Sequence, residues 1–264
     1  MHPRTVGRAL ALVALWTAAA QAAALVYVSR DGIDLRPGKD NSQKATSSLI
    51  TAPAAIGPWE TTPEVWAETV ACVKAIYAPF AVTITEDDPG DVPYIHAVFG
   101  GSPKDLGLPR SYAGVSPFAP DCSVIERSIV FTFTDILPPD AESACHVMAQ
   151  EIGHSFGLDH ELAEQSPMST ANRRGARAFL DEDVACGETS PRPCGLPKQT
   201  CRPMQNSYAL LADRVGLAGD PDATARSAPD DEIGCNAGGA DRGLLSIGAL
   251  LAALGRRRAR VRTG

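Results

Sequence analysis

The chain has 264 residues, of which 44% are hydrophobic, and its formal net charge is −7. This length suits one domain of about 200 residues with additional terminal segments. Residues 1–24 carry two arginines and no acidic residue, and residues 236–264 carry six arginines and one aspartate, so the middle is more acidic than the whole. An acidic body is a poor partner for nucleic acids, and we expect no nucleic-acid binding.

The first residues have the order of a secretory signal peptide. Arg4 and Arg8 precede an apolar run over residues 9–20, and the alanines at 22–24 offer a cleavage site. The apolar run is too short for a membrane span. We therefore predict that residues 1–24 are a signal peptide and that the protein is exported.

The next part of the chain alternates between strands and helices. Runs rich in β-branched and aromatic residues predict strands at 25–29, 80–85, 94–99 and 128–134. An apolar stripe at helical spacing predicts a helix that begins near Thr62 and Pro63 and ends at about Tyr77. Segments rich in Gly, Pro, Ser or Asp predict loops at 31–58 and 100–114.

Two further helices follow. Asp140 is the expected N-cap of one helix, because apolar residues recur at helical spacing after it. Residues 205–215 predict a closing helix. This order of elements is typical of an α+β domain in which helices pack on a twisted mixed sheet.

The segment from Gln150 to His160 reads Gln-Glu-Ile-Gly-His-Ser-Phe-Gly-Leu-Asp-His. Gln150 and His154 are four residues apart and share one helix face, with Glu151 beside them. Gly157 can adopt the left-handed conformation that ends a helix, so that the chain turns back and His160 approaches the same point. Two imidazoles could then hold one cation while a carboxylate faces a bound water.

These residues resemble the metal motif of the metzincin zinc proteases, H-E-x-x-H-x-x-G-x-x-H followed by a turn that bears a methionine, here Met168. The likeness is greatest to the matrixin-like branch. It implies that residues 25–218 form a metzincin-like catalytic domain that contains a Met-turn. It further implies Zn²⁺ held by His154 and His160, Glu151 as the general base, and a protein or peptide as substrate.

Gln150 stands where this family has its first histidine ligand. An amide oxygen can bind zinc, but zinc favours this neutral donor less than imidazole. Two functions stay open: a zinc endopeptidase in which Gln150 is a weak or substituted ligand, or a catalytically silent surface protein that uses the metzincin fold as a binding module. No tyrosine follows closely after Met168, so a tyrosine-assisted step is not implied.

Two other polar residues near the motif have side chains that can bind a metal. His146 lies about 12 Å along the helix from His154, too far for one metal. Asp159 adjoins His160 and is a better candidate, although a solvated loop carboxylate is the simpler interpretation. His96, in a predicted strand, is interpreted as a polar residue on a strand face.

Seven cysteines are present. Six of them precede residue 219, and an even number in an exported chain predicts disulfides: Cys72, Cys122, Cys145, Cys186, Cys194 and Cys201. The last three are close in sequence and predict one local bridge. The segment 191–197 resembles the cysteine switch of matrixin propeptides, but it follows the catalytic helix and contains an extra Pro193, so a disulfide at Cys194 is the simpler interpretation.

The C-terminal part has a different composition. Residues 219–234 are rich in Asp, Pro and Ala and predict a flexible linker. Cys235, an apolar stretch at 243–255 and an arginine cluster follow, an order that resembles the sorting tails of myxobacterial surface proteins. By this resemblance residues 235–264 are a sorting or anchor tail, with Cys235 as the sorting or lipidation site. A plain membrane anchor is the alternative. We expect a monomer that is exported to the cell surface or outer membrane, or released outside the cell.

Overall fold

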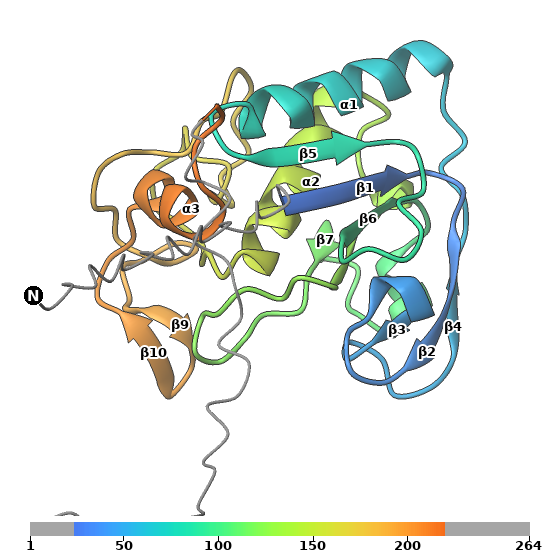
Figure 1. The fold of residues 1–264 in the computed structure, drawn as a ribbon, viewed down its shortest axis with the longest axis horizontal. Coiled ribbons are helices and arrows are strands. Elements are labelled where there is room, and N and C mark those ends of the chain that lie inside the picture. Colours follow the sequence, from blue (N-terminus) through green and yellow to red (C-terminus); the bar gives the residue numbers. More distant parts are fainter. Residues whose placement is uncertain (1–23, 220–264) are drawn as a thin grey trace, which may run out of the picture. The chain divides into compact units, whose positions relative to one another are not determined.

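A computed structural model describes residues 24–219 (Figure 1). The predicted signal peptide up to residue 23, the linker from residue 220 and the tail with Cys235 lie outside the described residues. Within residues 24–219, no helix has the length and apolar character that a membrane span requires. The described part is an α+β domain with a mixed sheet and three α-helices, which confirms the predicted fold class at this level.

The main sheet has five strands and is parallel except at one edge. In spatial order the strands are β5 (Val82–Thr85), β1 (Ala24–Ser29), β6 (Ile95–Phe99), β8 (Ile129–Thr132) and β7 (Gly114–Val115). The short strand β7 runs antiparallel to β8 and forms one edge. All residues of β6 and β8 are buried, because both faces of the sheet are covered. The four predicted strands are confirmed, with small differences at their ends.

Two helices pack on one face of this sheet and against each other (Figure 1). Helix α1 (Pro63–Tyr77) begins as predicted, with the Thr62 side chain accepting a hydrogen bond from the Val65 amide. Helix α2 (Ala141–Ser155) has Asp140 as its N-cap, as predicted. The Tyr77 hydroxyl donates a 2.8 Å hydrogen bond to the Ala149 carbonyl, which helps to fix α2, the helix that carries the motif, against α1.

The other face is covered by a small second sheet. This sheet contains β2 (Ile33–Pro37), β3 (Thr46–Ser47) and β4 (Ala54–Ile56), with the 3₁₀ helices η1 (Ser42–Lys44) and η2 (Pro103–Leu106). Leu35 and Ile56 join Phe131 of β8 in a second hydrophobic cluster. The prediction of one long loop over 31–58 was therefore wrong. These strands are too short to show an alternating pattern of apolar and polar residues. They are defined by the pairing of β2 with β3 and β4.

The C-terminal part of the domain carries shorter elements: η3 (Thr134–Ile136), the hairpin β9 (Cys194–Leu196) and β10 (Gln199–Arg202), and α3 (Ser207–Val215). Helix α3 confirms the predicted closing helix.

Three disulfides join the six predicted cysteines: Cys72–Cys145, Cys122–Cys201 and Cys186–Cys194. The last pair is the predicted local bridge. Three disulfides indicate folding in an oxidising environment.

Candidate metal centre

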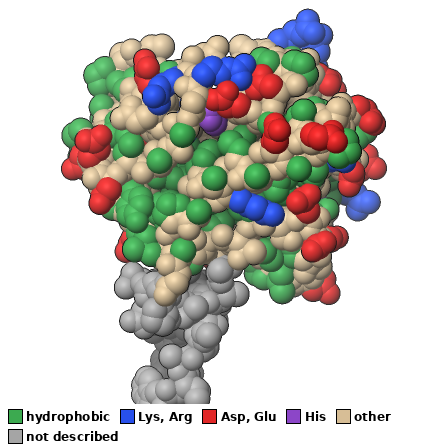
Figure 2. All heavy atoms as spheres, turned by 90° about the horizontal axis from the view of Figure 1, so that it is seen from above, with side chains coloured by type: hydrophobic (Ala, Val, Ile, Leu, Met, Phe, Trp, Pro, Cys, Tyr) green, Lys and Arg blue, Asp and Glu red, His purple; other side chains and the backbone are tan. Residues whose placement is uncertain are grey.

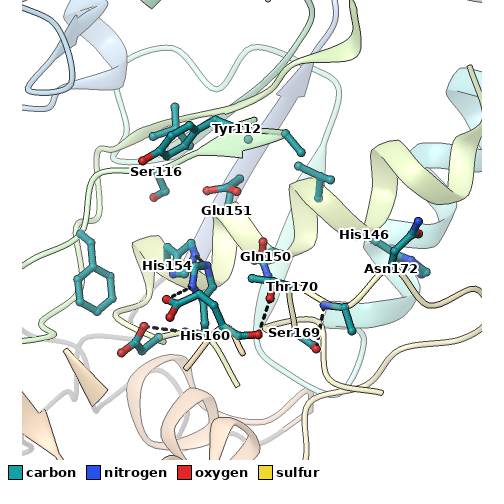
Figure 3. Close-up of a pocket in the computed structure, with 18 of the residues that line it drawn as sticks. Tyr112, Ser116, His146, Gln150, Glu151, His154, His160, Ser169, Thr170 and Asn172 are labelled. Atoms are coloured by element: carbon teal, nitrogen blue, oxygen red, sulfur yellow. Dashed lines mark hydrogen bonds and ion pairs between the residues drawn. The ribbon is translucent and has the colours of Figure 1, made fainter. Parts of the chain in front are cut away.

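Helix α2 forms the floor of a cleft, and the edge strand β7 forms one wall (Figure 3). The opposite wall comes from the chain after Met168 and from residues around Glu188 and Arg192. In Figure 2 a histidine side chain is visible at the surface between basic and acidic side chains. The cleft thus gathers the residues of the motif at one open site.

The turn after α2 brings the two histidines together. Gly157 has φ +73°, in the left-handed region, and its amide donates to the His154 carbonyl at 2.8 Å. A side chain at this glycine would collide with the Cys122 carbonyl. The Leu158 amide then donates to the Gly153 carbonyl at 3.0 Å, and the chain reverses toward α2. This ending of the helix was predicted from the sequence, and it places His160 beside His154.

The Nε2 atoms of His154 and His160 face each other at 3.1 Å. The other ring nitrogen of each histidine already has an acceptor: Nδ1 of His154 lies 2.7 Å from the Leu158 carbonyl, and Nδ1 of His160 lies 2.9 Å from a carboxylate oxygen of Glu188. A carbonyl or an ionised carboxylate can only accept, so each ring carries its proton on Nδ1. When both rings are in the neutral form, each therefore directs an Nε2 lone pair at the same point.

Two facing lone pairs repel unless a cation lies between them. Burial and the nearby His160 lower the pKa of His154 to about 3, which keeps this ring neutral and able to bind a metal cation. A tetrahedral zinc ion with bonds of about 2.0–2.1 Å holds its nitrogen ligands about 3.3 Å apart, close to the observed separation. The donor set and its spacing therefore fit a divalent metal that prefers imidazole.

Glu151 lies next to this pair and points toward β7 (Figure 3). Only 5% of the residue is exposed, and a Cβ on Gly114 of β7 would lie 2.6 Å from its Oε1 atom. Burial raises the pKa of Glu151 to about 8. A divalent cation nearby favours the ionised form, in which the carboxylate can accept a proton.

Gln150 lines the same cleft from the same face of α2 (Figure 3). Its side chain makes no hydrogen bond to any other residue among 24–219. The amide is therefore free to contribute an oxygen donor, and nothing in the described chain competes for it.

Met168 lies beneath the site and is fully buried. Its amide donates to the Ser166 hydroxyl at 3.0 Å, and its carbonyl accepts from the Glu161 amide at 3.0 Å, so the turn is closed on both sides. A Cβ on Gly153 of α2 would collide with the Met168 sulfur. The turn thus packs directly against the helix that carries Gln150 and His154.

An ion-pair network supports His160 from outside, and the sequence did not reveal it. Arg192 donates to Asp159 from both terminal guanidinium nitrogens, at 2.5 and 3.0 Å, and also donates to Glu188 at 2.7 Å. Burial alone would raise the pKa of Asp159, but hydrogen bonds from Arg192 and from the Gly195 and His160 amides lower it. Hydrogen bonds from Arg192 and His160 lower the pKa of Glu188 to about 2.

The interpretation of Asp159 as a solvated loop carboxylate was wrong, because the residue is only 6% exposed. Ligand atoms of Asp159, His160 and Glu188 lie within 4.8 Å of one another. Arg192 pairs with both carboxylates, so this group is an ion-pair network and Asp159 is not free to bind a metal.

The two other histidines among residues 24–219 are placed away from the pair. His146 lines the cleft two turns earlier in α2 (Figure 3). His96 lies in β6, stacks on Tyr27 and is 2.8 Å from the Ser29 hydroxyl. Burial lowers the pKa of His96 to about 4. These contacts agree with its interpretation as a structural residue on a strand face.

No protein-family model and no curated protein matches this chain. The geometry of the cleft is therefore the basis for assigning a function.

Proposed function

We propose that this protein is an exported, metzincin-like zinc endopeptidase. In this proposal His154 and His160 hold zinc, Gln150 supplies a weaker third donor, and Glu151 is the general base. The observation that carries it is the pair of Nε2 atoms, 3.1 Å apart, in rings whose Nδ1 atoms are both committed to acceptors. Such outer acceptors are the usual partners of metal-binding histidines.

Zinc, when bound, lowers the pKa of a coordinated water to about 7 and polarises a carbonyl oxygen. Glu151 accepts a proton from the attacking water as the new bond from oxygen to the carbonyl carbon forms. The same carboxyl group then gives that proton to the amine nitrogen as the carbon–nitrogen bond breaks. The burial of Glu151 raises the pKa of its carboxyl group, whereas bound zinc would lower it, and these opposing effects suit a group that both accepts and releases a proton.

The edge of the sheet favours an extended peptide as substrate. Strand β7 pairs with β8 on one side, and no strand pairs with its other side in the part of the chain that the structure describes. Residues 113–116 line the cleft beside Glu151. A peptide laid along this edge would gain main-chain hydrogen bonds, and the half-exposed Tyr112 offers it an apolar surface.

Gln150 favours a second candidate, a silent binding module that keeps the fold and has lost tight metal binding. Metal content separates the two. The full chain, purified with its disulfides intact, would be analysed for zinc by mass spectrometry and assayed on unfolded protein with and without a chelator. We expect about one zinc per chain and cleavage that the chelator stops. A folded protein that takes up no added zinc and cleaves nothing would reject the enzyme and favour the module.

The disulfides support the cellular location in part, since they need an oxidising environment. We propose that residues 1–24 direct export and that the tail with Cys235 attaches the mature protein to the cell surface.

A further inference from the structure

We propose that Glu188 is a positioning residue that orients His160, and that the disulfide-closed loop Cys186–Cys194 holds Glu188 in place. The inference rests on the proposed metal centre, and it names the residues that make His160 fit to serve in it. Glu188 is not itself a ligand here, because it contacts Nδ1 of His160, whereas Nε2 faces His154.

The contact between Glu188 and His160 decides which ring nitrogen carries the proton. A carboxylate oxygen 2.9 Å from Nδ1 keeps the proton there and leaves Nε2 with a free lone pair. The ring plane is fixed by the same bond. Without this acceptor, His160 could rotate or carry its proton on Nε2, and either change would remove a metal donor.

An exposed glutamate does not usually stay in one rotamer, yet this one is held from a second direction. The side chain of Glu188 is 49% exposed, and Arg192 binds the same oxygen at 2.7 Å. Arg192 is in turn anchored on the buried Asp159 by two hydrogen bonds, a geometry that restricts the guanidinium plane. Asp159 directly precedes His160. The contacts that run from His160 through Glu188 and Arg192 therefore return to the turn that carries His160.

The backbone of the loop is also tied to the site. The Gly187 amide donates to the His160 carbonyl at 3.0 Å, and the Thr170 hydroxyl donates to the Glu188 carbonyl at 3.2 Å. The Arg192 amide donates to the Cys186 carbonyl at 2.8 Å, next to the disulfide between residues 186 and 194. The covalent bond closes a short loop whose two charged side chains both reach the turn that carries His160.

The experiment compares Glu188→Ala and Glu188→Gln with the wild-type full chain. Glu182→Ala is the matched control, because Glu182 is an exposed acid nearby that makes no contact with the site. Two-dimensional NMR of the ring nitrogens in metal-free protein reports the tautomer of His160, and competition with a chelating dye reports zinc affinity. Thermal unfolding shows whether each variant is folded.

In the wild type we expect the proton on Nδ1 of His160. Glu188→Ala should shift the proton toward Nε2 and weaken zinc binding roughly 10- to 100-fold. Glu188→Gln keeps an oxygen acceptor and should lose less, and Glu182→Ala should match the wild type. A folded Glu188→Ala protein with an unchanged tautomer and unchanged zinc affinity would overturn the proposal.

The role of the loop has its own variant, in which Cys186 and Cys194 are both replaced by serine. We expect the same direction of change as in Glu188→Ala. A wild-type tautomer and affinity in this double variant would reject the part assigned to the loop. If the wild type takes up no zinc but Glu188→Ala still shifts the tautomer, the proposed enzyme fails while the positioning role of Glu188 stands.

Discussion

Replacing Gln150 with histidine is the most informative single change in this protein. Gln150 shares the cleft and the helix face with His154, and its amide makes no hydrogen bond within residues 24–219. The substitution therefore breaks no existing contact in the described chain. It adds an imidazole of similar length next to two rings that are already oriented by the Leu158 carbonyl and by Glu188.

The expected gain follows from the number of donors. Structural zinc sites with four protein ligands bind with about 10–16 kcal/mol, or roughly 3 kcal/mol per ligand. The amide of Gln150 already supplies part of the binding free energy of one ligand. The rings of His154 and His160 need no reorganisation when a third imidazole is added. We expect Gln150→His to gain about 1.4–2.7 kcal/mol, which is about a 10- to 100-fold tighter zinc affinity. In saturating zinc the melting temperature should rise by about 3–10 °C.

The assay is a competition titration with a chelating dye, together with thermal unfolding in zinc and in chelator. Gln165→His is the matched control, because Gln165 is exposed and does not line the cleft. Peptide hydrolysis should increase in Gln150→His and should not increase in Gln165→His. Equal zinc affinity in Gln150→His and the wild type would mean that the Gln150 position does not converge with the two histidines on one point, and the proposed metal centre would be wrong.

Further predictions concern the base, the cysteines, a buried histidine and export. Glu151→Ala should lower peptide hydrolysis about 10²–10⁴-fold with zinc content nearly unchanged, as measured by kinetics and metal analysis; an unaffected rate would place the chemistry elsewhere. Thiol counting under denaturing, non-reducing conditions should find no free thiol among the six paired cysteines, and six free thiols would contradict the pairing. The depressed pKa of His96, about 4, means that the unfolded state binds more protons below about pH 6.5. Stability should therefore fall by about 3 kcal/mol between about pH 6.5 and 4, and His96→Gln should flatten this fall in urea unfolding; an unchanged slope would refute the assignment. The intact mass of the surface-exposed protein should lack both termini, and the presence of Met1 or Arg262 in it would count against the signal and the sorting tail.

Local signals in the sequence predicted the helices well. Thr62 and Asp140 cap their helices through side-chain oxygens, and this chemistry needs only the next three residues. The same locality explains why the first part of the site was predictable. Helical spacing aligns Gln150 with His154, and Gly157 ends the helix, so the approach of His160 could be inferred from eleven consecutive residues.

The parts that were missed depend on partners distant in sequence. Strands β2, β3 and β4 have only five, two and three residues, and their pairing defines them more than their composition does. Glu188 contacts His160 across 28 positions of the chain. An exposed glutamate between a glycine and a threonine carries no local sign of such a role. Only the pairing of Arg192 with Asp159 and the closure of the disulfide bring it to the histidine.

The short disulfide between Cys186 and Cys194 has a consequence for the producing cell. In the cytoplasm thiols are kept reduced, so the loop would be open and Glu188 would be free to leave His160. A newly made chain of the proposed endopeptidase would then bind zinc more weakly and would be less able to cleave proteins around it. Oxidation after export would close the loop and complete the metal centre. For the proposed endopeptidase this would be a form of latency that needs no inhibitory segment, because the change of compartment itself would switch the activity on.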